Sequence, residues 1–149
     1  MTLRDGEQAV DVAYNDQEKV DILWALSDAG VKRAQIGFTG RDESVATAAK
    51  SAGVPIDLEL MTVLTNQNWR SELSLARDIG VDSVNLLIRS SDDMIRLLGL
   101  DRSSVAALAV EATKFARELG FQHVVFGPSF VTQADPEFLL SLYKSAGSV

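Results

Sequence analysis

The sequence predicts an α/β fold built on a parallel sheet, and three observations lead to this class. One phrase recurs along the chain, in which a helical pattern ends in an apolar residue and glycine and a short β-branched run follows. These runs are almost continuously apolar, as is typical of parallel strands that helices cover. Strands and helices alternate over the whole length, which is typical of a doubly wound sheet or a (β/α)₈ barrel.

The strands are expected directly after the glycines, because glycine suits the left-handed position that follows a helix C-terminus. The tip of a first strand is expected right after Met1, and Gly147 would precede a sixth strand. The four complete strands between them are expected at residues 34–38, 58–63, 83–88 and 123–126.

The segments between the strands are expected to be helices, at residues 16–28, 42–51, 68–78 and 92–118, with a break near Gly99 in the last. Asn15 with Glu18 three residues later has the pattern of a capping box, and Asp101 and the Ser90-Ser91 pair are candidate helix caps. Trp24 lies at helical spacing with apolar residues and is expected to pack between helix and sheet. Trp69 opens a helix near the third loop and is expected to pack, with contact to a substrate as the alternative.

The length predicts an incomplete barrel or a complete smaller sheet. A whole eight-unit barrel takes about 250 residues, so 149 residues would supply about five βα units. Left alone, that open sheet would have unpaired edges and an uncovered inner face, so a partner or further sequence is expected. The alternative is a doubly wound sheet of five strands, whose usual glycine-rich loop after the first strand is missing here.

Composition excludes several classes of function. A net charge of −7 argues against a nucleic-acid partner, because such affinity rests largely on basic residues that neutralise phosphates. No apolar run approaches the roughly 20 residues that span a bilayer, and no signal pattern opens the chain, so a cytoplasmic protein without a membrane partner is expected. Cysteine is absent, which excludes disulfides, thiolate metal sites and a cysteine nucleophile.

Functional residues are expected at the carboxyl ends of the strands, where parallel α/β proteins hold their sites. Arg4 and Asp5 lie together at the first of these ends. A carboxylate suits a hard divalent cation, and a guanidinium beside it suits an enolate or carboxylate oxygen. On spacing alone, adjacent Arg and Asp are commonplace, and a surface ion pair in a βα loop is the favoured interpretation.

The string Thr2-Leu3-Arg4-Asp5-Gly6-Glu7-Gln8 resembles the opening of the metal-dependent TIM-barrel family of isopropylmalate, homocitrate and citramalate synthases and hydroxymethylglutaryl-CoA lyase. Its Gly-Glu-Gln ending is similar to the synthase branch. Weaker similarity follows at residues 15–22, 29–38, 82–92, 112–119 and 135–146. The resemblance implies that residues 1–149 form one incomplete (β/α)₈ TIM-barrel catalytic domain, which starts in strand 1 and ends at strand 6.

The resemblance also implies a Claisen condensation in amino-acid biosynthesis. Acetyl-CoA would lose a methyl proton, and its enolate would attack the keto group of a 2-oxo acid bound to Mg²⁺, Mn²⁺ or Zn²⁺. Asp5 would be the metal ligand and Arg4 would stabilise the oxyanion. Glu7 and Gln35 would be further catalytic residues, by supporting the first loop and by orienting the substrate. The expected substrate contacts are Gln8, Thr62, Arg89, Ser91 and Gln133. Expected partners are the 2-oxo acid, the acyl-CoA, and further copies of the chain or a complementary chain.

Three departures from the family pattern keep other functions open. Gln35 stands where the family has a glutamate, and residues 127–133 lack an expected acidic pair and arginine. The expected two-histidine motif would lie after Val149, so the metal site is expected to be incomplete. The only histidine, His123, is expected at the opposite end of its strand as a surface or structural residue. The alternatives are a non-catalytic barrel fragment that binds a carboxylic acid or a partner subunit, and a carbon–carbon lyase or aldolase.

Overall fold

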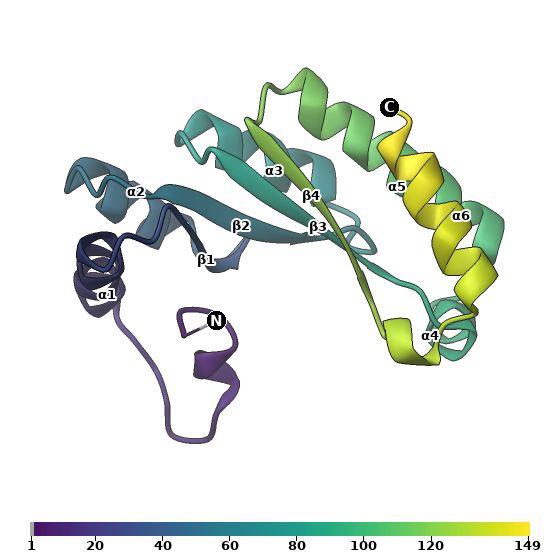
Figure 1. Ribbon diagram of the computed structural model, residues 1–149, viewed down its shortest axis with the longest axis horizontal. Coiled ribbons are helices and arrows are strands. Elements are labelled where there is room, and N and C mark those ends of the chain that lie inside the picture. The colour runs from purple at the N-terminus through teal and green to yellow at the C-terminus, as the bar shows by residue number, and fades with distance from the viewer. Residues whose placement is uncertain (1) are drawn as a thin grey trace.

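Four parallel strands form one sheet in the order β1-β2-β3-β4 in the computed structural model, which describes residues 2–149 (Figure 1). The strands are β1 Arg33–Phe38, β2 Asp57–Val63, β3 Ser83–Arg89 and β4 His123–Ser129. The helices are α1 Asp16–Asp28, α2 Glu43–Ser51, α3 Trp69–Asp78, α4 Asp92–Leu97, α5 Arg102–Glu118 and α6 Pro136–Gly147, with short 3₁₀ helices η1 Gly6–Gln8 and η2 Val131–Gln133.

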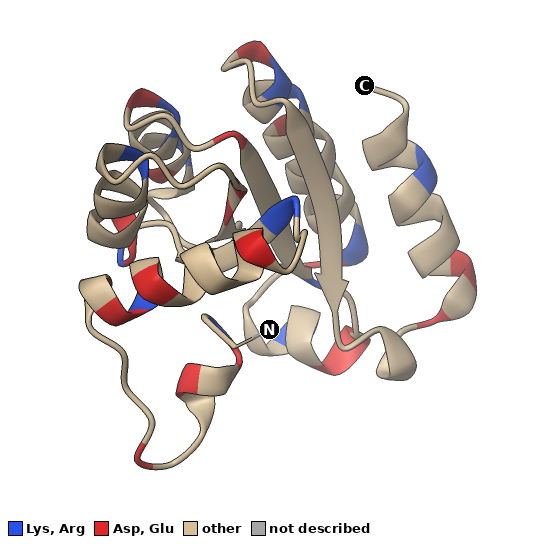
Figure 2. Cartoon of the chain, turned by 60° about the vertical axis from the view of Figure 1, so that its left-hand side comes forward, with Lys and Arg blue, Asp and Glu red and all other residues tan. Residues whose placement is uncertain are grey.

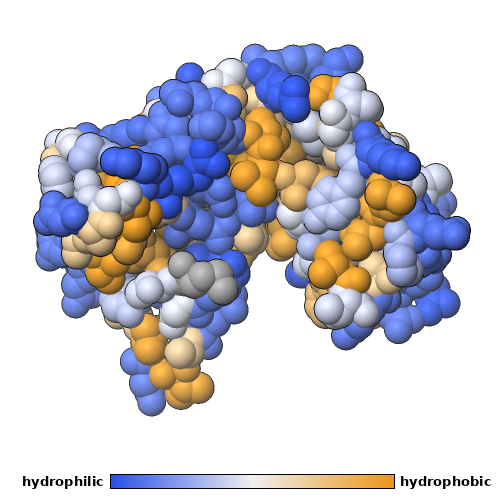
Figure 3. Space-filling model, viewed as in Figure 1, coloured by the Kyte–Doolittle hydropathy of each residue, from blue (hydrophilic) through white to orange (hydrophobic). Residues whose placement is uncertain are grey.

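The strand order favours the barrel over the doubly wound sheet. Each strand pairs in parallel with the next strand along the chain, whereas a doubly wound sheet reverses its order at a switch point. The helices lie along one side of the curved sheet (Figure 1). The other side is hollowed between the N-terminal segment and the region around α4 (Figure 3). The described sheet is therefore an open part of a (β/α)₈ barrel.

The N-terminal residues differ from the sequence prediction. A strand tip is expected there, yet Thr2 to Asp5 form turns that lead into η1. The backbone bonds of this segment are local, with Gln8 N donating to Asp5 O at 3.0 Å and Ala9 N to Gly6 O at 3.2 Å. A strand needs a ladder of bonds to a neighbour, and the segment contacts β1 through side chains instead. At the other end, Gly147 closes α6.

Local helix signals are confirmed with one exception. Asn15 accepts a hydrogen bond from Glu18 N, and the Glu18 side chain accepts one from Asn15 N, which completes the capping box of α1. Asp101 accepts one from Ser104 N at the start of α5. The prediction of a serine side-chain cap for α4 is wrong. Ser91 is in the N-cap position but makes no side-chain cap bond, and the Ser90 hydroxyl donates to Ser129 O at 2.6 Å.

The core lies between the sheet and its helices. It includes Ile36, Leu60 and Leu86 from neighbouring strands, all fully buried. Trp69 packs there as expected and meets Phe115 edge to face, with ring centroids 5.6 Å apart. The expectation for Trp24 is wrong, since it is 39% exposed. Leu23 occupies the sheet-facing position of α1, and a rotation of about 100° per residue carries the next side chain away from the sheet. Within residues 2–149, no helix has both the length and the apolar character to cross a bilayer.

Candidate functional site

Arg4 contacts the face of the sheet opposite the helices. This face, called the inner face below, carries Gln35, Glu59 and Ser83, which are neighbours in the register of β1, β2 and β3. Arg4 Nε donates to Gln35 Oε1 at 2.7 Å, and its guanidinium forms an ion pair with Asp5. The structure therefore brings three of the predicted site residues together, on the first segment and β1.

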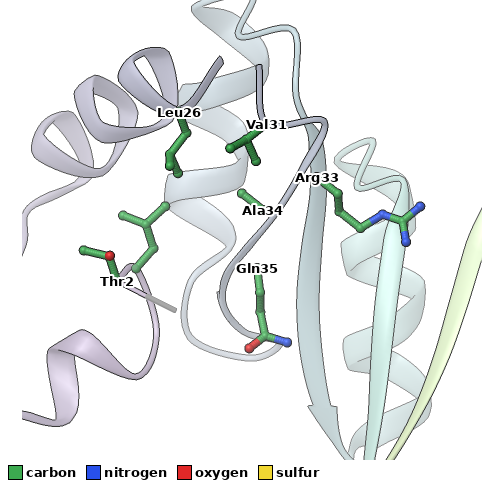
Figure 4. A pocket seen from close by; sticks show the side chains of 7 residues that line it. Thr2, Leu26, Val31, Arg33, Ala34 and Gln35 are labelled. Carbon is green, nitrogen blue, oxygen red and sulfur yellow. The ribbon is translucent and has the colours of Figure 1, made fainter. Parts of the chain in front are cut away.

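A cavity of about 250 Å³ lies behind this contact, between the N-terminal segment, the end of α1 and the start of β1. Figure 4 shows Gln35 and Thr2 on its border, with Leu26, Val31 and Ala34 above them. Its lining residues are apolar apart from Thr2, Arg33 and Gln35. Gln35 therefore borders the cavity with the same side chain that contacts Arg4.

Gln35 continues the chain of hydrogen bonds to β2. Its Nε2 donates to Glu59 Oε1 at 2.7 Å, and Glu59 is only 7% exposed. The amide of Gln35 therefore has a cation at its oxygen and a carboxylate at its nitrogen. Arg4, Gln35 and Glu59 are named the inner-face relay below. Glu59 is a functional candidate that the sequence reasoning missed, because its pairing with Gln35 depends on the register of the sheet.

Glu7 lies in a different group, the lysine cluster of Glu7, Lys19, Asp42 and Arg41. Lys19 is 3% exposed, and its Nζ donates to Glu7 Oε2 at 2.8 Å and to Asp42 Oδ1 at 3.1 Å. Figure 2 shows acidic residues on α1 and on the segment that precedes it, the two elements that Lys19 and Glu7 join. Tyr14 N also donates to Glu7 Oε1, at 3.3 Å. Glu7 thus fastens the N-terminal segment to α1.

The charges of the lysine cluster stabilise each other. Burial acts to lower the pKa of Lys19, but the bonds to Glu7 and Asp42 outweigh it and raise that pKa above 10.5. Burial acts to raise the pKa of Asp42, but Phe38 N–H, Lys19 and Arg41 together lower it below 3.8. The sequence holds a signal for the burial of Lys19. Lys19 is four residues before Leu23 and therefore shares the sheet-facing side of α1.

The remaining predicted substrate residues do not join the inner-face relay. Thr62 is fully buried on the helix side, where its hydroxyl donates to Thr39 Oγ1 at 3.1 Å and Thr39 Oγ1 in turn donates to Glu72 Oε2 at 3.0 Å. Because Thr62 is closed to solvent on that side, we leave it out of the proposed substrate contacts. Gln8 and Gln133 are exposed on η1 and η2.

Arg89 and Ser91 lie at the carboxyl end of β3. Arg89 Nη1 donates to Ser129 Oγ at 3.1 Å, and its guanidinium lies 5.4 Å from the centre of the Phe130 ring. Ser91 is buried, and its hydroxyl has no hydrogen-bond partner among the described residues. Arg89 is half-buried and keeps further N–H groups for an anionic ligand.

The donor set for a metal is small. Across residues 2–149, no group of three or more His, Cys, Asp or Glu side chains is placed to hold an ion. Asp5 offers carboxylate oxygens at the inner face, with Arg4 as its charged neighbour. His123 is half-exposed at the first residue of β4, with Nε2 3.8 Å from Asp57 Oδ2, and is a surface residue as expected. A divalent cation needs at least four ligands, so the described side chains do not complete a site.

Comparisons with known proteins agree with the arrangement of the sheet and the N-terminal string. The model of the HMGL-like family matches residues 1–149. The chain belongs to the HMGL-like family. It is 32% identical to a probable 2-isopropylmalate synthase of Methanopyrus kandleri over 97% of this chain and 29% of that protein. A putative (R)-citramalate synthase of Archaeoglobus fulgidus is also 32% identical, over 97% of this chain and 30% of that protein.

Homocitrate synthase AksA of Methanothermobacter thermautotrophicus is 26% identical, over 97% of this chain and 37% of that protein. This chain therefore spans about a third of the length of these curated relatives. Its resemblance to the synthase branch is confirmed. The structure of HMG-CoA lyase from Bacillus subtilis superposes with a TM-score of 0.69 at 14% identity, covering 99% of this chain and 52% of that one. This likeness supports the fold, a partial TIM barrel.

Proposed function

We propose that this chain is the N-terminal part of the catalytic barrel of an acyl-CoA-dependent 2-oxo-acid acyltransferase. The observation that carries the proposal is the placement of Arg4, which the Gln35 amide holds on the inner face beside Asp5. The synthase names of the relatives agree with it. The reaction would join the methyl carbon of acetyl-CoA to the keto carbon of a 2-oxo acid.

Arg4 would stabilise negative charge in this reaction. Its Nε donates to Gln35, which fixes the orientation of the guanidinium. Its terminal nitrogens then lie next to the Asp5 carboxylate. A preorganised donor of this kind lowers the energy of a developing oxyanion, and loss of one such donor typically costs about 100- to 1,000-fold in rate. Gln35 is a positioning residue in this scheme, and Glu7 acts further away by fastening the first segment through Lys19.

Arg89 would bind the carboxylate of the 2-oxo acid. Its planar guanidinium suits a carboxylate in two-pronged contact, and Ser91, Gln8 and Gln133 would supply neutral contacts around the substrate. Asp5 would hold the divalent cation, which, when bound, would polarise the keto group of the substrate. The described residues provide only this one ligand. The remaining ligands would come from further barrel units, either in a longer polypeptide that contains residues 1–149 or in a partner subunit.

A second candidate is a non-catalytic barrel fragment that binds a carboxylic acid or a partner subunit. Gln35 favours it, because an amide neither carries charge nor acts as a general base. A lyase running the same enolate chemistry in reverse is the third. In all three cases we expect a cytoplasmic protein, and association with further copies or with a complementary chain that covers the inner face.

A chimera tests the proposal, in which this chain replaces the matching N-terminal region of the Methanopyrus kandleri relative. We expect the folded chimera to release free CoA thiol from acetyl-CoA when a 2-oxo acid and a divalent metal are present. The Asp5→Asn chimera should lose this activity, and an Asp78→Asn chimera, changed at the end of α3, should keep it. A folded chimera that releases no thiol with any short 2-oxo acid would support the non-catalytic candidate. Cleavage of a hydroxyacyl-CoA without condensation would support the lyase.

A further inference from the structure

Glu59 is a buried carboxylate to which the proposed chemistry assigns no role. It lies on the inner face of β2, directly beside Gln35 in the register. Among the described residues, no Lys, Arg or His forms an ion pair with it, and its side-chain bond is the one from Gln35 Nε2 at 2.7 Å. Burying a carboxylate is costly unless hydrogen bonds or opposite charge compensate. The nearest compensation along its hydrogen bonds is Arg4, on the other side of the Gln35 amide.

The amide of Gln35 permits this link in one orientation only. Its oxygen accepts from Arg4 Nε and its nitrogen donates to Glu59 Oε1, both at 2.7 Å. A carboxamide has one accepting end and one donating end, so a cation must be on the first side and an acceptor on the second. Each charge polarises the amide in the direction that strengthens the bond to the other. The relay therefore couples the position of Arg4 to the charge on Glu59.

We propose that Glu59 is a positioning residue, which holds Arg4 on the inner face through the polarised amide of Gln35. Arg4 and Asp5 alone would be a neutral pair, and Glu59 gives the three groups one net negative charge. That charge balances Arg4 from the sheet side and leaves Asp5 less neutralised. The role of Glu59 in catalysis rests on the proposed function of Arg4, whereas the coupling itself is a property of this chain and needs no turnover to be measured.

The test is the exchange of the Arg4 Nε–H proton with water in the ¹⁵N-labelled full chain, assigned by its loss in Arg4→Lys. Glu59→Gln keeps an oxygen to accept from Gln35 and removes only the charge. We expect it to speed the exchange about tenfold, because a hydrogen bond to a charged acceptor is roughly twice as strong as one to a neutral acceptor. The matched control is Glu72→Gln, which removes a half-buried carboxylate on the helix side, and it should leave the exchange unchanged.

A swap decides whether the charge itself is coupled. Gln35→Glu alone places two carboxylates side by side, and we expect a lower urea midpoint of unfolding than in the wild type. The double variant Gln35→Glu/Glu59→Gln returns one carboxylate and one amide to the pair, and should recover both the midpoint and the slow exchange of Arg4 Nε–H. Equal exchange rates in wild type and Glu59→Gln would overturn the proposal. So would a double variant whose changes in urea midpoint and exchange rate equal the sum of the changes in its two single variants. If Gln35→Glu does not fold, the comparison of Glu59→Gln with Glu72→Gln still decides. These exchange rates and unfolding midpoints are measured on the chain itself and do not depend on activity of the chimera. The two proposals can therefore fail separately.

Discussion

Removal of the Lys19 charge should weaken the fold by about 3 kcal/mol in the variant Lys19→Met, which keeps most of the apolar stem. Lys19 is 3% exposed, and its partners Glu7 and Asp42 have side chains that are 16% and 8% exposed. Leaving buried charges without their partner typically costs about 3–5 kcal/mol. We expect the lower end of this range, because Arg41 Nε remains 2.9 Å from Asp42 Oδ2. That arginine is 58% exposed, and an exposed pair contributes about 1 kcal/mol or less.

The pH dependence of this effect has a definite sign. The pKa of Asp42 is lowered below 3.8 by folding, so its contribution is present above that pH and is lost as the pH falls through the folded value. The pKa of Lys19 is raised above 10.5, so its contribution is complete at neutral pH and is lost only in strongly alkaline solution. In Lys19→Met the Asp42 carboxylate is less stabilised, and the decline of stability in acid should be smaller.

Urea unfolding followed by circular dichroism between pH 3 and pH 8 measures both effects. The matched control is Lys32→Met, at an exposed lysine between α1 and β1, which should change the free energy of unfolding by about 0.5 kcal/mol or less. A Lys19→Met variant as stable as this control at pH 7, or one with an undiminished acid decline, would refute the claim that Lys19 fastens the N-terminal segment through a buried ion cluster.

Three further outcomes are expected. Arg4→Lys in the chimera should slow thiol release about 100-fold, because an ammonium cannot keep both the Gln35 bond and the planar donors; a loss of less than about threefold would exclude Arg4 from the oxyanion site. Gly37→Ala should lower stability by about 1–3 kcal/mol, since its Cβ would overlap the Asp42 carboxylate, whereas Gly147→Ala, which meets open space, should be tolerated in the same urea assay. Asn15→Ala should cost about 1 kcal/mol by loss of the α1 cap, and Glu18→Gln, which keeps an acceptor for Asn15 N, should cost less; equal losses would argue against the capping box.

The sequence predicts the elements well where local chemistry decides them. The Asn15 capping box begins α1, and Gly30 ends it in a left-handed conformation with φ of +84°. The parallel arrangement follows from the alternation of strands and helices, and the four complete strands form at the expected places. The string around Arg4 and Asp5 leads to the family, which the family model confirms.

The side chains are less predictable where partners are far apart in the sequence. Residues 58–64 read as almost continuously apolar, so nothing in them shows that Thr62 faces the helices and Glu59 the inner face. The bond from Gln35 to Glu59 joins residues 24 apart and depends on strand register. The spacing of Lys19 with Leu23 indicates the buried side of α1, but its partner Asp42, 23 residues later, is brought beside it only by the fold. Tertiary pairing rather than local propensity sets these contacts.

The measurement that tests the central claim most directly is calorimetric titration of Mn²⁺ into the chain and into the chimera. If this chain supplies one part of a metal and enolate site through Asp5 and Arg4, the chain alone should bind weakly or not at all, and the chimera should bind one ion tightly. Asp5→Ala should abolish the tight binding in the chimera. Tight stoichiometric binding by the chain alone, lost in Asp5→Ala, would contradict the claim, as would a chimera whose metal affinity does not depend on Asp5.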